Sequence, residues 1–239
     1  MNNYLNNHTS TQQSAVSDSV FAKLMRSVYA WMCAGLLMTA FTAMTVARNA
    51  ELLTMLLTNK MLFWGIMIAE IALVIYLSAR IMRMAFLTAA LCFAAYSILN
   101  GVTMSFIFMA YTAESIASTF MITAGTFGAM SLVGFFVKKD LSGMGRMLIM
   151  LLIGLIIASV VNIFLANSTM AVILNYLGVL IFVGLTAYDT QKIKTMLQHA
   201  AYYGMSEQTQ KIALLGSLTL YLDFVNMFLY LLRIFGNRE

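Results

Sequence analysis

The sequence predicts an all-α membrane protein, a bundle of seven transmembrane helices, and three observations support this fold class. Apolar residues make up 62% of the 239 residues and charged residues only 10%, whereas soluble proteins average roughly half and a quarter. The apolar residues gather in long runs, and Lys and Arg lie mostly at the ends of those runs. A water-soluble fold of this length could not bury so much apolar surface, which excludes that class.

The seven apolar runs are each long enough to cross a bilayer as a helix, which takes about 20 residues. They are continuously apolar and not alternating, which favours helices over the strands of a membrane barrel. The third run is the longest, so its helix should tilt or project beyond the bilayer. Two very short connectors, at 112–114 and 167–170, should make the helices they join antiparallel. The runs cover residues 28–47, 61–79, 84–111, 115–137, 147–166, 171–191 and 212–235.

The first 20 residues differ in composition from the rest of the chain. They are rich in Asn, Ser, Thr and Gln and lack a basic start followed by an apolar run, so they do not resemble a secretory signal peptide. We predict a disordered polar cytoplasmic tail over residues 1–20 and a single seven-helix membrane domain over residues 21–239.

The basic residues predict the orientation of the bundle. Ten of the 14 fall on the side of the N-terminus and four on the other side, and the positive-inside rule then puts the N-terminus in the cytoplasm and the C-terminus outside. The same placement explains the net charge of +5, so we expect a lipid bilayer and no nucleic acid as partner. The ten are Lys23, Arg26, Arg80, Arg83, Lys138, Lys139, Arg146, Lys192, Lys194 and Lys211, and the four are Arg48, Lys60, Arg233 and Arg238.

Small residues recur every three positions in the fourth run, at Gly125, Gly128, Ser131 and Gly134. Small side chains let helix backbones approach closely inside lipid, so this stripe predicts a tight helix contact. A hinge or permeation role is the alternative.

Cofactor and metal chemistry find few candidate ligands. Cys33 and Cys92 both fall inside apolar runs, so we expect neither a disulfide nor a metal site. His8 lies in the polar tail and His199 in a connector, which disfavours a histidine-dependent site within the membrane. We expect no bound cofactor.

Three carboxylates, Glu70, Asp189 and Asp223, fall within or at the end of apolar runs. An ionised carboxylate near the bilayer centre costs about 2.5–3.5 kcal/mol on insertion scales. Such a group is retained when it pairs, faces an aqueous cavity or takes up a proton. The three residues are therefore candidate functional residues.

Asp189 and Asp223 lie on consecutive antiparallel helices and can meet at one depth. Asp223 is about 11 residues, or ~16 Å, into the last run. Asp189 lies at the end of its helix if that helix stops near residue 191, and about two turns deeper if it continues through "KIKTMLQ". In the first case Asp189 is a solvated end residue, and in the second the two carboxylates can touch.

A pair of touching carboxylates has distinctive chemistry. In a poorly hydrated site both cannot ionise cheaply, so they share a proton and titrate near neutrality, which makes a pH sensor. When fully deprotonated they form a dense anionic oxygen site, which suits a hard cation such as Ca²⁺.

Three motifs resemble the Bax inhibitor-1 family, specifically its bacterial members. They are "VKKDLSGMG" at 137–145, "AYDTQKIK" at 187–194 and "LYLDFVNMFLYLLRIFG" at 220–236. The resemblance extends from about residue 21 to the C-terminus. It implies a seven-helix bundle whose last helix is central, in the inner membrane, and a pH-sensitive calcium leak.

The resemblance also implies roles for individual residues. The family's buried aspartate pair falls on Asp189 and Asp223, as pH sensor and cation gate. Its arginine latch, late in the second helix, falls in "LSARIMR" on Arg80, with Arg83 as the competing register. Glu70 sits at an acidic position of some relatives, as a buried partner or as a residue of the cation path.

Two further functions compete with a cation leak channel. A modulator of other membrane proteins, transporting nothing itself, would share the same sequence features. An intramembrane aspartyl protease of the presenilin type also needs two aspartates on neighbouring helices. Its second aspartate follows Gly-x-Gly, however, whereas here the context is "LYLD", and its Pro-Ala-Leu element cannot occur in a chain without proline. We therefore expect no enzymatic activity.

Overall fold

The computed structural model describes the backbone of residues 2–237 and the side chains of residues 17–237. The described chain is helical and contains no strand. The prediction of a disordered tail over residues 1–20 falls largely on residues 1–16, whose side chains lie outside the described part. In chain order the elements are α1 (Asn2–Arg48), α2 (Ala50–Thr58), α3 (Lys60–Arg80), the 3₁₀ turn η1 (Ile81–Arg83), α4 (Phe86–Met104), α5 (Ile107–Ala110), α6 (Ala113–Phe136), α7 (Ser142–Leu165), α8 (Ser168–Ala201) and α9 (Glu207–Phe235).

Seven helical segments of the described residues are long and apolar enough to cross a membrane, which confirms the predicted fold class. Two of them join neighbouring elements, since α3 runs into η1 and α4 into α5. The short α2, between the first two spans, was not predicted. Its N-terminus is capped by the Asn49 side chain, which accepts hydrogen bonds from the N–H groups of Glu51 and Leu52.

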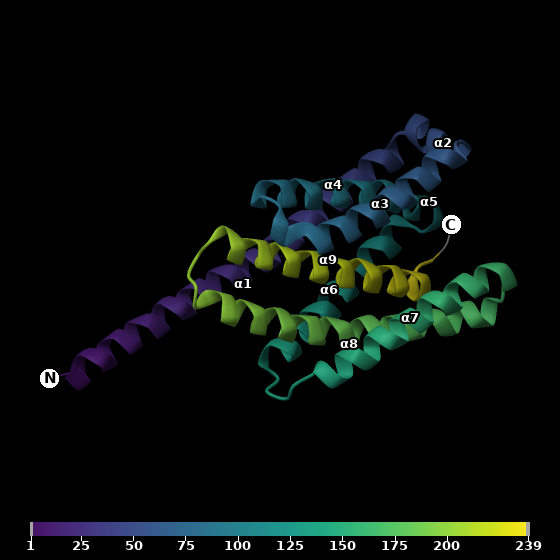
Figure 1. Cartoon of the computed structure of the whole chain (residues 1–239). Coiled ribbons are helices and arrows are strands. Elements are labelled where there is room, and N and C mark those ends of the chain that lie inside the picture. The colour runs from purple at the N-terminus through teal and green to yellow at the C-terminus, as the bar shows by residue number, and fades with distance from the viewer. Residues whose placement is uncertain (1, 238–239) are drawn as a thin grey trace.

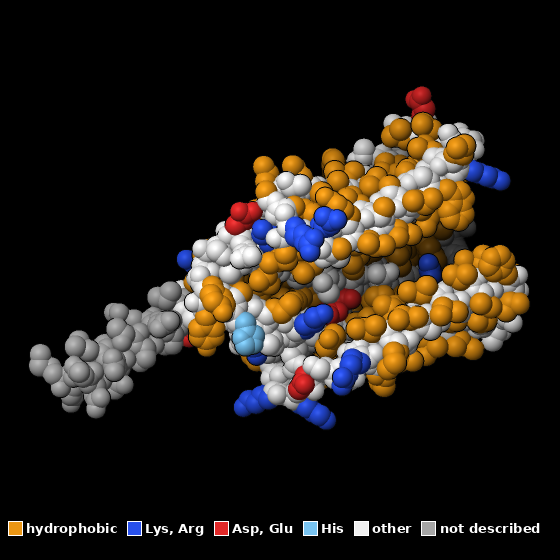
Figure 2. Space-filling view, viewed as in Figure 1, with side chains coloured by type: hydrophobic (Ala, Val, Ile, Leu, Met, Phe, Trp, Pro, Cys, Tyr) orange, Lys and Arg blue, Asp and Glu red, His pale blue; other side chains and the backbone are white. Residues whose placement is uncertain are grey.

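α9 is the central helix of the bundle, as the resemblance implied. It runs between α3 and α4 on one side and α7 and α8 on the other (Figure 1), and it packs against α1, α4, α6 and α8. In the most apolar 18-residue stretch of α9, 67% of the residues are buried, whereas in that of the α3 segment only 6% are buried. The outer helices turn their apolar side chains outward instead (Figure 2), and these surfaces fit a lipid environment.

α8 is longer than its apolar run. Its 34 residues span about 51 Å at 1.5 Å per residue, well beyond the ~30 Å core of a bilayer. The chain therefore stays helical through the polar residues 192–201. Lys192, Lys194 and His199 lie on this helix and not in a connector, so the prediction for His199 was wrong.

Only the C-terminal half of the small-residue stripe of α6 contacts another helix. Gly134 is buried against α8, where an added Cβ would lie 2.1 Å from the Ala187 carbonyl oxygen, and Ser131 accepts a hydrogen bond from Thr190. Gly125 and Gly128 have no atom within 4 Å of an added Cβ, so their predicted contact was wrong. A three-residue step falls about 60° short of a full helical turn, so the stripe drifts halfway around the helix over nine residues.

Candidate functional site

Asp223 lies deep in the bundle because α9 is enclosed on several sides. Only 5% of the residue is exposed. The following residue, Phe224, packs edge-on against Phe120 and Phe127 of α6, with ring centroids 5.3 and 5.5 Å apart. α9 begins five residues before the predicted run, at a capping box in which Ser206 and Thr209 exchange hydrogen bonds. Asp223 is therefore a carboxylate with little access to water.

The carboxyl group of Asp223 lies next to that of Asp189 on α8, close enough for the two groups to interact directly. Because α8 continues to Ala201, Asp189 lies 12 residues, or about 18 Å, before its end, which resolves the two depths left open by hydropathy. Ionised carboxylates only accept hydrogen bonds, so a hydrogen bond between the two groups requires one proton between them. No N–H or O–H of the other described residues reaches Oδ2 of Asp223. The pair thus depends on its own proton.

The surroundings of Asp189 combine close packing with one nearby cation. Thr190, the next residue, donates to Ser131 Oγ of α6 at 3.3 Å. Ala187, two residues earlier, is the carbonyl that Gly134 approaches. Lys192, about one turn along α8, acts electrostatically on Asp189. Within the described residues, no third His, Cys, Asp or Glu joins the pair to form a group that could hold a metal ion.

The structure does not bring Arg80 to the aspartate pair. Arg80 is the last residue of α3 and Arg83 is the last residue of η1, and both side chains are exposed. Within the described part of the chain neither forms an ion pair with Asp189 or Asp223. The latch, and its register between the two arginines, stays a prediction for another conformation.

Glu70 belongs to a second polar group, on the opposite face of α9. The hydroxyl oxygen of Thr103 on α4 lies 2.9 Å from Glu70 Oε1 and 3.0 Å from the Asn100 carbonyl oxygen, and its one proton serves either acceptor. The Asn100 side chain in turn accepts from the Tyr221 hydroxyl at 3.2 Å, and that hydroxyl lies 2.6 Å from Thr39 Oγ1 of α1. Sequence reasoning missed Tyr221, since a tyrosine in an apolar run reads as packing.

Replacing Tyr221 by phenylalanine is expected to lower the free energy of unfolding by about 1–2 kcal/mol, because Thr39 and Asn100 then lose a buried partner. Tyr221 is fully buried, with 0% exposed. Titration of the purified protein in mixed micelles with a denaturing detergent measures the change. The same substitution at Tyr176, which is 56% exposed on α8, is the control. Equal effects at both positions would contradict a structural role for the hydroxyl network.

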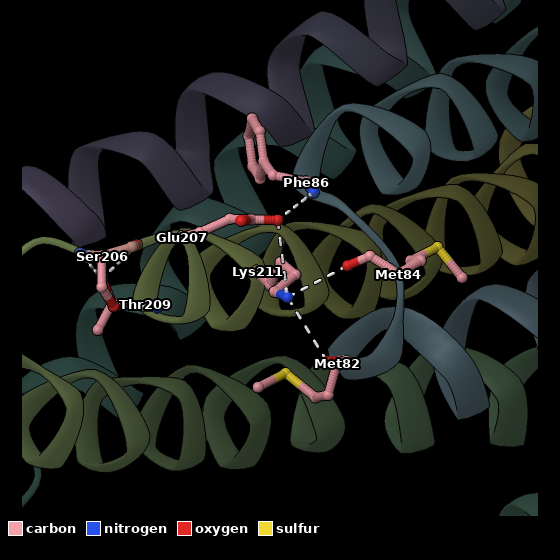
Figure 3. Close-up of polar contacts among 7 residues, drawn as sticks. All are labelled: Met82, Met84, Phe86, Ser206, Glu207, Thr209 and Lys211. Carbon is pink, nitrogen blue, oxygen red and sulfur yellow. Dashed lines mark hydrogen bonds and ion pairs between the residues drawn. The ribbon is translucent and has the colours of Figure 1, made fainter.

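A third polar cluster, the Lys211–Glu207 clamp, ties the start of α9 to the connector between η1 and α4 (Figure 3). Lys211 Nζ donates to the Met84 and Met82 carbonyls at 3.1 and 3.5 Å and lies 3.8 Å from Glu207 Oε1. The same Glu207 oxygen accepts from the N–H of Phe86, the first residue of α4, at 2.7 Å. Lys211 thus binds carbonyl groups at the C-terminal end of η1, and Glu207 binds an N–H group at the N-terminal end of α4. The helix dipole favours both arrangements.

Sequence reasoning counted Lys211 only among the basic residues that set the orientation and assigned no role to Glu207. In the structure, the Lys211 side chain is only 10% exposed, although that of Glu207 is 58% exposed. The clamp also holds the connector that follows Arg80 and Arg83, so it restricts where those arginines can move.

Replacing Lys211 by methionine should lower the free energy of unfolding by about 2 kcal/mol, because hydrogen bonds from a charged group to two carbonyls are lost while the length of the side chain is kept. The detergent titration that measures Tyr221→Phe serves here too. Lys60→Met, at an exposed position at the start of α3, removes the same charge where the described residues form no ion pair with it, and is expected to be nearly neutral. A neutral result at Lys211 would show that the clamp adds nothing to stability.

A family model described as "Inhibitor of apoptosis-promoting Bax1" matches residues 21–239. The chain belongs to the Bax inhibitor-1 family. The match takes in all seven spans apart from the start of the first, and with them both aspartates, Glu70 and the two candidate latch arginines.

Bacterial relatives of the Bax inhibitor-1 family match almost the whole chain. "Inner membrane protein YbhL" of Escherichia coli K12 is 52% identical over 215 residues, which cover 90% of this chain and 92% of the relative. Uncharacterized proteins of Deinococcus radiodurans and Rickettsia prowazekii are each 40% identical, covering 96% and 100% of both chains respectively. Together with the seven apolar helices, this similarity makes the chain a multi-pass inner membrane protein of the Bax inhibitor-1 family.

Proposed function

We propose that the chain is a cation leak channel, with Ca²⁺ as the cation, and that the proton shared by Asp189 and Asp223 controls the leak. The observation that carries this proposal is the proximity of these two carboxyl groups at the contact of α8 with the central α9. With the proton in place, a hydrogen bond between them holds the two helices together. Without it, two negative charges face each other in a site with little water.

The ligand set of the pair favours passage of a cation over its retention. Ca²⁺ takes six to eight oxygen ligands, and the pair supplies at most four carboxylate oxygens. No other acid among the described residues joins them, so water and backbone carbonyls must complete the shell. Conduction needs binding that is weak enough for the ion to leave. The Glu70–Thr103 group, on the other face of α9, offers a further oxygen site for such an ion.

Flux through liposomes that contain only the purified protein tests this proposal. A channel releases trapped Ca²⁺ without a partner, and the release varies with pH near neutrality. A modulator of other membrane proteins leaves the vesicles tight at every pH. That outcome would favour the second function, and the aspartate pair would then be a structural contact between α8 and α9.

For the orientation, we propose a cytoplasmic N-terminus and an external C-terminus. Seven crossings put the start of the first span and the end of α9 at opposite ends of the bundle (Figure 1), and the basic residues choose which end faces the cytoplasm. An alkaline phosphatase reporter fused after Glu239 should therefore be active. An inactive phosphatase, together with an active cytoplasmic reporter at the same position, would contradict this orientation.

A further inference from the structure

A basic cleft opens at the end of the bundle where α8 projects beyond its apolar run. Its volume is about 870 Å³, within the range of small-ligand sites. One wall is the connector between α6 and α7, and the other is the polar end of α8. Figure 2 shows Lys and Arg side chains gathered at this end of the molecule. The charged residues that line the cleft are Lys138, Lys192, Lys194 and Asp140, and His199 lines it as well.

The connector wall is held in a defined position. The Gln191 side chain of α8 accepts from the Leu141 N–H at 2.8 Å and donates to the Lys139 carbonyl at 2.9 Å. Lys194 donates to the Phe135 carbonyl at 2.7 Å, near the end of α6, and its Nζ lies 4.8 Å from the centre of that residue's ring. The cleft therefore has two fixed walls, and a ligand would pay little to order them.

The charges of the cleft favour an anion. Asp140 is the one acid among the described residues that line the cleft, and its carboxylate already has hydrogen-bond partners. Its carboxylate accepts from the N–H and hydroxyl of Ser142 at 2.9 and 2.7 Å, and these bonds hold the pKa of Asp140 below its usual value, helped by nearby Arg146. The ammonium groups of Lys138 and Lys192 are exposed and form no ion pair with an acid among the described residues. Lys192 acts electrostatically on Asp189 and its Nζ lies 5.9 Å from the centre of the Tyr188 ring, and both interactions leave its hydrogen-bond donors open to an anion.

The position of the cleft favours a lipid headgroup as the source of that anion. Phe136, on its lip, ends α6 and is 70% exposed, as expected for a side chain that faces lipid. The polar residues of the cleft begin where the apolar runs stop, which is the level of the phosphate groups of a bilayer. A lysine at this level is attracted to an anionic membrane surface.

We propose that this cleft binds a phosphate-bearing anion, in the form of the headgroup of an anionic phospholipid, through Lys138 and Lys192. The aromatic lip receives the glycerol and the first part of the acyl chains. Lys194 remains occupied with the end of α6 and shapes the wall. This proposal concerns binding alone and stands whether or not the protein conducts cations.

Native mass spectrometry of the purified protein tests the site, with phosphatidylglycerol and phosphatidylcholine as the two lipid probes. The wild type should retain phosphatidylglycerol more strongly. A double variant, Lys138→Gln with Lys192→Gln, should lose affinity for it by about tenfold or more. The control is Lys23→Gln with Lys139→Gln, which removes the same charge from exposed positions outside the cleft lining and should change affinity less than about twofold.

A soluble probe separates the two sources of phosphate. If glycerol 1-phosphate does not displace the bound lipid at millimolar concentration, the acyl part contributes and the ligand is a lipid. If it displaces the lipid, and binds alone with the same dependence on Lys138 and Lys192, the cleft is a site for a soluble phosphate ester. Equal losses in both double variants, or equal retention of the two lipids by wild type, would overturn the proposal.

Discussion

Replacement of Asp223 by asparagine flattens the pH dependence of Ca²⁺ flux in liposomes. The amide keeps the size of the carboxyl group and can hydrogen-bond to Asp189, but it has no proton to lose near neutrality. In wild type the shared proton decides whether α8 and α9 are held by a bond or pushed apart by two charges. The variant should therefore leak at one rate across the range of pH in which the wild-type rate changes severalfold.

The companion variants show whether the two residues act as one unit. Asp189→Asn should flatten the profile as Asp223→Asn does, and the double variant should add little, because residues of one hydrogen-bonded pair are not independent. Asp18→Asn removes a carboxylate from an exposed position on α1 and should leave the profile unchanged. An unaltered wild-type profile in Asp223→Asn would show that Asp223 is a structural polar residue and not the switch.

Gly134→Val should disrupt folding more strongly than Tyr221→Phe or Lys211→Met. The new Cβ would lie 2.1 Å from a backbone oxygen, that of Ala187, which cannot swing away as a flexible side chain can. Overpacking usually costs about 1–3 kcal/mol and sometimes more, and a clash with backbone belongs at the upper end. α6 and α8 must separate, beside Asp189. Most of the expressed variant should therefore elute as aggregate in size-exclusion chromatography.

Gly128→Val supplies a matched control on the same helix. It adds the same β-branched side chain, with the same cost in helix propensity, at a position where no atom lies within 4 Å. It should elute as wild type does. If the two variants behave alike, the close approach of α6 to α8 is not what limits folding of this bundle.

The parts of this molecule that depend on lipid could be predicted from sequence. A helix that crosses a bilayer needs a long apolar run, and a carboxylate within such a run needs a reason, so the seven spans and both aspartates were visible in the residue order. Hydropathy reports contact with lipid and not helicity, however. A prediction from hydropathy therefore ended α8 at residue 191, ten residues before the helix ends, and started α9 five residues late.

The parts that depend on three-dimensional partners could not be predicted. Lys211 and Glu207 look like solvated charges until the connector before α4 folds over them. The polar role of Tyr221 depends on a hydrogen bond with Thr39, a residue 182 positions away in the chain. The small-residue stripe failed for a geometric reason, since three-residue spacing leaves the contact face and only Ser131 and Gly134 remained on it.

The central position of α9 has a consequence for the order of events during biogenesis. The helices that enclose α9 precede it in the chain, so its contacts form only after they have entered the membrane, and such late, long-range contacts slow folding. Until then Thr39, Asn100 and Asp189 lack their partners on α9 and face lipid or one another. The half-made bundle is therefore the form most exposed to membrane proteases and chaperones, and destabilising substitutions along α9 should show themselves first as reduced abundance in the cell.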